Sequence, residues 1–235
     1  MPLRAVIFDF DGVIANSEPL HLQAFQDILA AERVTLTDAD YYAYYLGFDD
    51  AGVFREIDRA RGPRWTARDI NALVARKAVR LEELERDRSV MFPGAADALR
   101  RIAAAVPIAI ASGARGEEIR RMLDRERLTS LFAAIVAAED TPASKPAPDP
   151  YLRAVALVGA ARGAAVTPRD CVAVEDSGWG LQSARTAGLH TVAVTSSYTA
   201  AELAAADRVI ASLHELTLAL LTNLAGIPPD LDFER

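Results

Sequence analysis

Two carboxylates two residues apart, Asp9 and Asp11, follow the first apolar segment of the chain. In an extended chain, side chains at this spacing point to the same side. Carboxylates held this close need a cation, or one of them keeps its proton. An ionised aspartate can attack phosphorus and a protonated neighbour can donate to the leaving oxygen, so the pair suits phosphoryl transfer. The alternative is an ordinary turn, in which Asp and Gly, here Gly12, are common.

Polar side chains also follow or lie between later apolar segments. Ser112 and Gly113 could hold a phosphate oxygen through the hydroxyl and backbone N–H groups, although Ser-Gly is also a common turn. Lys145, in the proline-stiffened segment SKPAP, could neutralise charge on a phosphoryl group or be a solvated surface charge. Glu175 and Asp176 could hold Mg²⁺ through oxygen ligands or be the acidic start of a helix.

Short apolar segments predict the strands that would position these residues. They are Leu3 to Phe8, Pro107 to Ser112, Ala133 to Ala138, Cys171 to Asp176, His190 to Thr195 and Arg208 to Ala211. Helical patterns lie between them, at about Ala95 to Ala104, Gly116 to Arg127, Pro150 to Ala161 and Trp179 to Ala187. This alternation predicts an α/β fold, a Rossmann-like parallel sheet with helices on both faces. Ligands of such sheets lie beyond the carboxyl ends of the strands, where the acidic residues and Ser112 are expected.

Residues 17 to 90 break this alternation and show only helical patterns. Ser17 is the predicted N-cap of the first helix of this block, and Thr66 with Asp69 forms a predicted capping box. We therefore expect an all-helical cap domain at residues 16–91, inserted into a catalytic core formed by residues 1–15 and 92–235.

Composition excludes several classes of protein. The chain has 235 residues, a formal net charge of −7 and no long basic run, which argues against nucleic-acid binding. Its single cysteine, Cys171, cannot form an internal disulfide. We predict no signal peptide and no membrane-spanning segment, and we expect a cytoplasmic protein that is a monomer or a weak homodimer.

Taken in order, four segments resemble the successive motifs of the haloacid-dehalogenase-like hydrolases. They are FDFDGVIANSE, ASG, SKPAPDPY and VEDSGWGLQSARTAG. The resemblance covers nearly the whole chain and is greatest to the β-phosphoglucomutase-like and phosphoglycolate-phosphatase-like branch. Members of that branch insert a helical cap just after the first motif, where this chain has its helical block.

The resemblance implies a role for each matching core residue. Asp9 is expected to be the nucleophile that forms an aspartyl-phosphate, and Asp11 the general acid and then the base that activates water. Ser112 and Lys145 are expected to bind the transferring phosphoryl group, with Gly113 as a further substrate contact.

The same resemblance implies a Mg²⁺ site. Its expected ligands are Asp9, the backbone carbonyl of Asp11 and Asp176, with Glu175 as a ligand or as a partner of one. The dehalogenases of the superfamily lack the second aspartate, so Asp11 argues against a haloacid substrate.

Residues of the cap are expected to set specificity. His21 and Lys77 match positions that face the site in the resembled branch, although both could also be ordinary surface residues. Glu18, at the end of the first motif, is a further candidate for substrate binding. The segment LGFDD aligns with one that carries a phosphate-binding arginine in β-phosphoglucomutase. Here Asp49 and Asp50 stand in that neighbourhood, and an acidic pair repels a second phosphate.

We therefore predict a Mg²⁺-dependent phosphatase that hydrolyses a small phosphorylated metabolite, expected to be a sugar phosphate. A sugar phosphomutase that uses the same aspartyl-phosphate is the alternative. A non-catalytic binding protein on this fold is a third hypothesis, against which the full set of polar motif residues argues.

Overall fold

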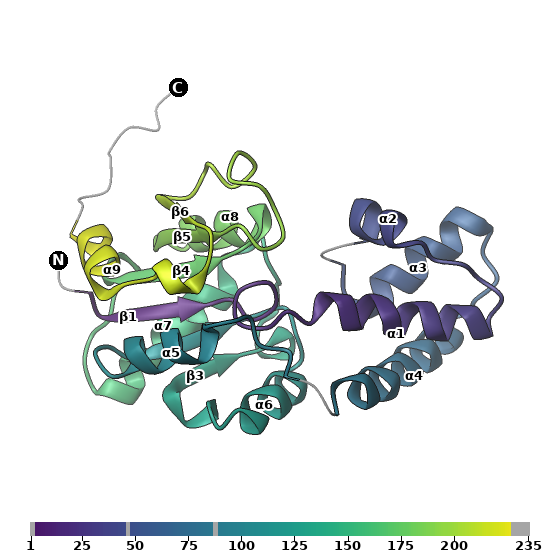
Figure 1. Ribbon diagram of the computed structural model, residues 1–235, viewed down its shortest axis with the longest axis horizontal. Helices are drawn as coiled ribbons and strands as arrows, with labels where there is room; N and C mark the ends of the chain where they lie inside the picture. Colours follow the sequence, from purple (N-terminus) through teal and green to yellow (C-terminus); the bar gives the residue numbers. More distant parts are fainter. Residues whose placement is uncertain (1–2, 46–47, 87–88, 227–235) are drawn as a thin grey trace. The chain divides into compact units, whose positions relative to one another are not determined.

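The computed structural model describes residues 3–45, 48–86 and 89–226, which form two compact units (Figure 1). One unit comprises Met1–Asn16 and Met91–Arg235, and the other comprises Ser17–Val90. These limits lie one residue away from the domain limits expected from the sequence. Leu46 and Gly47 of the LGFDD segment lie outside the described residues.

The larger unit contains a six-stranded parallel sheet in the order β3-β2-β1-β4-β5-β6. The strands are β1 Ala5–Phe8, β2 Ile108–Ala111, β3 Phe132–Val136, β4 Cys171–Glu175, β5 His190–Val194 and β6 Arg208–Ile210. Each lies within the predicted segment or starts one residue before it, so the α/β prediction is confirmed. Continuous apolar segments of this kind are typical of strands that are buried on both faces.

Helices cover both faces of this sheet. They are α5 Ala95–Ala103, α6 Gly116–Arg125, α7 Asp149–Arg162, α8 Gly178–Thr186 and α9 Leu218–Ala225. The connections from β1 to β2 to β3 run in one direction along the sheet, and those from β3 to β4 to β5 run back. Because parallel crossovers are right-handed, the two sets of helices lie on opposite faces. The direction in which successive strands are added therefore reverses at β1, which has β2 on one side and β4 on the other.

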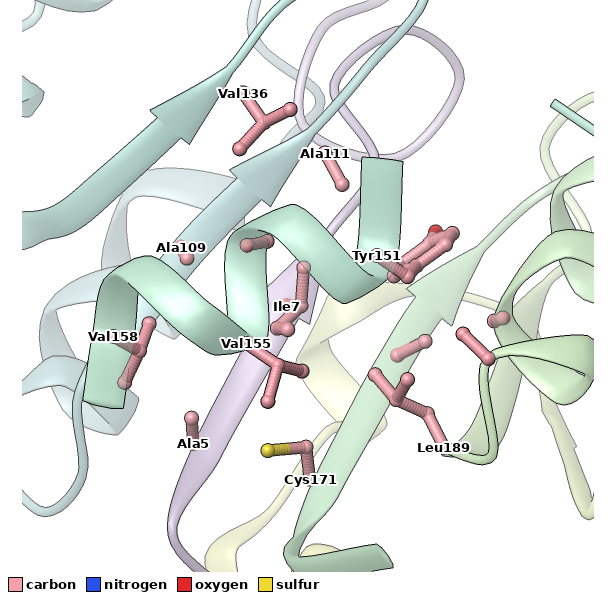
Figure 2. Close-up of a cluster of buried hydrophobic side chains, with 14 residues drawn as sticks. Ala5, Ile7, Ala109, Ala111, Val136, Tyr151, Val155, Val158, Cys171 and Leu189 are labelled. Carbon is pink, nitrogen blue, oxygen red and sulfur yellow. The ribbon is translucent and has the colours of Figure 1, made fainter. Parts of the chain in front are cut away.

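One large apolar cluster joins α7 and α8 to the sheet (Figure 2). Ala5 and Ile7 of β1 face this cluster, and the intervening Val6 faces the other side of the sheet because side chains alternate along a strand. Tyr151, Ala154 and Val155 are the cluster's contribution from the first two turns of α7. This packing fixes the position of α7, and of the segment that precedes it, against β1 and β4.

The smaller unit is helical. It contains α1 Glu18–Ala31, α2 Asp38–Asp40, a π-helical turn at Tyr41–Tyr45, α3 Asp50–Arg61 and α4 Ala67–Glu85. Apolar side chains at helical spacing in α1, α3 and α4 form its core, among them Phe25, Phe54 and Leu73. The prediction of a helical block over this part of the chain is confirmed for its described residues.

Both predicted helix caps of this unit lie at the predicted positions, and they differ in their hydrogen bonding. The capping box of Thr66 and Asp69 is present at the start of α4. Ser17 occupies the N-cap of α1, but its side chain makes no capping hydrogen bond. Its backbone is helical, with φ −81° and ψ −23°, whereas a capping side chain requires an extended N-cap residue. The prediction that Ser17 is the N-cap of this helix is confirmed in position, without the side-chain hydrogen bond that is typical of a cap.

The tyrosines of the π-helical turn are divided between the core and the surface. Tyr41 is buried against Phe25, and Tyr45 contacts the same core. Tyr42 and Tyr44 are exposed. Among the described residues, no helix is both long and apolar enough to cross a membrane.

Candidate active site

Three predicted site residues follow three neighbouring strands at one edge of the sheet. Asp9 follows β1, Ser112 follows β2 and Asp176 follows β4, and β1 pairs with both of the other strands. This edge is formed by the carboxyl ends of the strands at the point where their order reverses. Ligands of open parallel sheets bind at such a point. The fold therefore brings together residues that are up to 167 positions apart in the sequence (176 − 9).

Lys145 reaches this edge from the segment before α7. Its Nζ lies 2.9 Å from Asp9 Oδ1 and 2.6 Å from Glu175 Oε1. Asp9 Oδ1 also accepts a hydrogen bond of 2.7 Å from the backbone N–H of Phe10. Burial alone would lower the pKa of Lys145, but the charges of Asp9 and Glu175 outweigh burial and hold that pKa above its ordinary value. Lys145 is thus a fixed cation beside Asp9, not a solvated surface charge.

The acidic residues at this edge are crowded and desolvated. Burial raises the pKa of Asp9 well above its ordinary value, and the charge of Glu175 raises it further, against the opposing effect of Lys145. Burial and the charge of Glu175 raise the pKa of Asp176 to about 7, and the charge of Asp11 contributes in the same direction. Three carboxylates and one ammonium group meet here, so when all are ionised the cluster carries more negative charge than Lys145 balances.

The donor set fits a hard divalent cation. Asp9, Glu175 and Asp176 each place one carboxylate oxygen within 4.8 Å of the others. Mg²⁺ prefers oxygen ligands and is usually held by one or two carboxylates, with water and phosphate completing its shell. Both oxygens of Glu175 already accept hydrogen bonds from protein donors. Asp9 and Asp176 are therefore the more suitable ligands, and the assignment of Glu175 as a ligand stays a prediction.

A tight loop carries Asp11 beyond β1. The backbone N–H of Gly12 donates to the carbonyl of Ala15 at 2.9 Å, and Asp11 and Ala15 form an isolated bridge. Gly12 has a φ of +77°, which glycine adopts without strain. The loop thus turns the chain sharply after Asp9 and keeps Asp11 near Asp176, consistent with the effect of Asp11 on the pKa of that carboxyl.

Ser112 and Gly113 lie in a turn between β2 and α6. Ser112 is buried, and its Oγ accepts a hydrogen bond of 3.0 Å from the backbone N–H of Ala114. Gly113 is exposed, and among the described residues no atom lies within 4 Å of a Cβ built there. The hydroxyl and the open backbone beside it form the kind of surface that can receive an anion.

Two residues at this site were missed by the sequence analysis. Ser197, in the loop after β5, donates a hydrogen bond from its hydroxyl to Asp176 Oδ2. Tyr151, in α7, donates to Glu175 Oε1 at 2.6 Å, and burial raises the pKa of its phenol well above the ordinary value. Tyr151 ends the segment SKPAPDPY, which could have pointed to it, whereas no local pattern marks Ser197.

The remaining candidates lie in the smaller unit and form three polar contacts there. Lys77 Nζ lies 2.7 Å from Asp50 Oδ1 and 2.8 Å from His21 Nδ1, which accepts because an ammonium group can only donate. The Lys77 side chain is 1% exposed. Glu18 accepts a hydrogen bond from the hydroxyl of Tyr41 at 2.5 Å. Lys77 is therefore a buried, paired cation, and the role of Glu18, His21 and Lys77 in substrate binding stays a prediction.

Comparison with known proteins agrees with this site. Residues 6–194 match the model of the haloacid dehalogenase-like hydrolase family. The chain belongs to this family. It is 33% identical to protein CbbY of Rhodobacter capsulatus over 209 residues, which cover 85% of this chain and 88% of that protein. It is 29% identical to hexitol phosphatase B of Escherichia coli over 218 residues, or 92% of this chain and 95% of that protein.

The fold comparison gives the same result. The crystal structure of CbbY from Rhodobacter sphaeroides in complex with phosphate has a TM-score of 0.81 and 26% identity, and the match covers 93% of this chain and 99% of that chain. A β-phosphoglucomutase from Clostridium difficile has the same TM-score at 18% identity, which shows a common fold only. The chain is thus a haloacid dehalogenase-like hydrolase, as its four motifs predicted.

Proposed function

We propose that this enzyme is a Mg²⁺-dependent phosphatase that hydrolyses a sugar phosphate or a related polyol phosphate. The observation that carries the proposal is the 2.9 Å contact between Lys145 Nζ and Asp9 Oδ1, beside the carboxylate of Asp176, at the reversal point of the sheet. This arrangement offers a nucleophile, a fixed positive charge and a cation site within one small region. Phosphoryl transfer depends mainly on such positioning and charge neutralisation.

In the proposed mechanism, Asp9 attacks phosphorus and forms an aspartyl-phosphate while the bond to the leaving oxygen breaks. Asp11 gives its proton to that oxygen, which leaves as an alcohol. Asp11 then takes a proton from the water that attacks phosphorus in the aspartyl-phosphate, and the carboxylate of Asp9 leaves as the new P–O bond forms. Lys145 and Ser112 bind the phosphoryl oxygens throughout. Together, these two reaction steps release one alcohol and one phosphate for each water molecule consumed.

Asp9, Asp176 and the backbone carbonyl of Asp11 would hold the metal ion. The chemistry that Mg²⁺ supplies when bound is neutralisation of phosphate charge and stabilisation of ionised Asp9. That second effect is needed here because burial raises the pKa of Asp9. An aspartate that keeps its proton is not a nucleophile.

The proposed substrate class rests on the relatives. Hexitol phosphatase B and fructose-1-phosphate phosphatase YqaB of Escherichia coli are 29% and 28% identical to this chain. A mutant CbbY crystallised with xylulose-(1,5)bisphosphate is 25% identical. In the smaller unit, Asp50 already pairs with the buried Lys77, which reduces the attraction of that cation for a second phosphate. We therefore favour hydrolysis of a monophosphate over the mutase reaction.

Phosphate release from a panel of sugar and polyol phosphates tests the proposal. Each compound is assayed with Mg²⁺ and with a chelator, using the wild type, Asp9→Asn and Asp97→Asn. Asp97 is exposed in α5 and is the matched control, so its variant should keep full activity. We expect Mg²⁺-dependent release that is lost in Asp9→Asn alone. Isomerisation of hexose phosphates without phosphate release would instead support the mutase.

A further inference from the structure

Four donors converge on the carboxylate of Glu175, which is fully buried. Oε1 accepts from Tyr151 and from Lys145, each at 2.6 Å. Oε2 accepts from the backbone N–H of Asp176 and the hydroxyl of Ser177, each at 3.2 Å. The two hydrogen bonds to Oε1 are short, and the four together hold this carboxylate in one orientation.

Gly180, in the first turn of α8, makes room for this carboxylate. A Cβ atom built at Gly180 would lie 2.0 Å from both oxygens of Glu175. The carboxylate therefore packs directly against the backbone of the helix, whose N-terminal end favours negative charge. Residues of three elements, α7, β4 and α8, thus surround this one buried carboxylate.

Tyr151 contacts this arrangement in two ways. Its hydroxyl shares Glu175 Oε1 with Lys145, and its ring centroid lies 5.3 Å from Lys145 Nζ, within the range of a cation–π contact. Figure 2 shows Tyr151 beside the carboxyl end of β4, at the opposite end of that strand from Cys171. The rest of the ring is enclosed by the apolar cluster, so the side chain cannot move without disturbing the sheet.

The result is a chain of contacts that ends at the proposed nucleophile. Tyr151 fixes Glu175, Glu175 fixes Lys145, and Lys145 contacts Asp9 Oδ1 at 2.9 Å. An ammonium group has three N–H donors, and two of those of Lys145 point at carboxylates. Among the described residues this leaves the third donor for a phosphoryl oxygen. The direction of that donor depends on where Glu175 Oε1 is held.

We propose that Tyr151 is a positioning residue that directs the ammonium group of Lys145 at Asp9 and at the phosphoryl group, acting through Glu175 and through its own ring. This inference rests on the proposed phosphatase function. Tyr151 does not touch the reacting atoms. It positions the ammonium group of Lys145, which neutralises charge that develops on the phosphoryl group in the transition state. Removal of the Tyr151 hydroxyl should therefore affect kcat more than KM.

Tyr151→Phe tests this, because it keeps the ring and the packing but removes the hydroxyl. Thr191→Val is the matched control: Thr191 is also buried and donates its hydroxyl to a carboxylate, Asp207 Oδ2 at 3.0 Å, near the start of β5. We expect kcat of Tyr151→Phe to fall about tenfold, roughly the effect of one hydrogen bond to a charged group, with KM within about twofold. Thr191→Val should lose about as much thermal stability as Tyr151→Phe does, and it should keep its kcat.

Crystal structures of the wild type and Tyr151→Phe give a second measurement that does not depend on turnover. We expect Lys145 Nζ to leave Asp9 Oδ1 or to take more than one position in the variant. An active wild type whose kcat is unchanged in Tyr151→Phe would overturn the inference, as would an equal loss in Thr191→Val. If the wild type releases no phosphate, the proposed function fails, and an unmoved Lys145 in the variant crystal would separately overturn the positioning role.

Discussion

A Cβ atom at Gly12 would lie 1.8 Å from Asp176 Oδ2, so the loop after β1 and the carboxylate after β4 fit together only when position 12 is glycine. The backbone at Gly12 also has a φ of +77°, which side chains disfavour. The position of Asp176, a proposed metal ligand, therefore depends on the absence of a side chain at Gly12. This relationship gives the first prediction.

Gly12→Ala should push the Asp176 carboxylate away from Asp9. A displacement of about 1 Å can lower a rate about 100-fold, and we expect a loss of kcat of at least that order. Gly163→Ala is the control, because Gly163 has a φ of +60° and, among the described residues, no atom within 4 Å of its Cβ position. It should lose about 1 kcal/mol of stability to backbone strain alone and keep its activity. Equal activity of the two variants would contradict the prediction.

Stabilisation by Mg²⁺ should increase with pH. The pKa of Asp176 is raised from 3.8 to about 7 in the metal-free protein. Between these values the unfolded chain has lost the proton and the native protein keeps it, so the contribution of this carboxyl to stability falls as pH rises from about 4 to about 7. Mg²⁺ binds the ionised carboxylate and must displace the proton below about pH 7.

We therefore expect the rise in melting temperature at one fixed Mg²⁺ concentration to grow from about pH 5.5 to about pH 7 and then level off. Differential scanning fluorimetry across this range measures it. Asp176→Asn should show neither the stabilisation nor its pH dependence. A stabilisation that is constant or that shrinks towards higher pH would show that no proton is displaced from the site.

Ser197 should contribute to metal affinity although the sequence gives no sign of it. Its hydroxyl donates to Asp176 Oδ2, and partners that orient a metal ligand commonly change affinity by about 10- to 100-fold. Ser197→Ala should weaken Mg²⁺ binding about tenfold in isothermal titration calorimetry. Thr199→Ala is the control in the same loop, because Thr199 donates to Glu202 at 2.7 Å instead. Unchanged or tighter Mg²⁺ binding by Ser197→Ala would count against an orienting role.

Much of the core was predictable because the signal lies in short continuous segments. Ala5–Phe8 and Cys171–Glu175 are largely apolar segments that are followed directly by Asp9 and Asp176, which predicted both the strands and the edge at which these two residues meet. A role for Lys145 at the phosphoryl group was expected from the family resemblance, but its contact with Asp9 was not predicted, because the chain between them is long and no local pattern sets it. The sheet order that closes this distance is a property of the whole fold.

The missed features depend on contacts between distant segments. Tyr151 has the periodicity of an ordinary buried helix residue, and its hydroxyl acquires a role only because α7 packs beside the end of β4. Ser17 occupies the predicted N-cap, but its backbone is helical and its side chain makes no capping hydrogen bond. Residue type therefore predicts what a side chain can do, and the packing of other elements decides whether it does so.

The pair of Lys77 and Asp50 should stabilise the smaller unit in a way that depends on both charges. Lys77 Nζ is 2.7 Å from Asp50 Oδ1 and 4.8 Å from the ring centroid of Phe25, and its side chain is 1% exposed. Asp50→Asn leaves a buried ammonium group without its counter-charge. Loss of one partner of a fully buried pair costs about 3 to 5 kcal/mol. Because the Asp50 side chain is 30% exposed, we expect about 2 kcal/mol.

Lys77→Met removes the buried charge and keeps most of the side-chain volume, so the double variant Asp50→Asn/Lys77→Met should be more stable than Asp50→Asn alone. Urea unfolding of the wild type, both single variants and the double variant gives a double-mutant cycle, in which we expect a coupling of about 1 to 2 kcal/mol. Glu56→Gln is the matched control, since Glu56 pairs with Arg59, whose side chain is 78% exposed. Its effect should stay within about 0.5 kcal/mol, as for other surface pairs. Additive single variants would show that Asp50 does not hold the buried charge of Lys77.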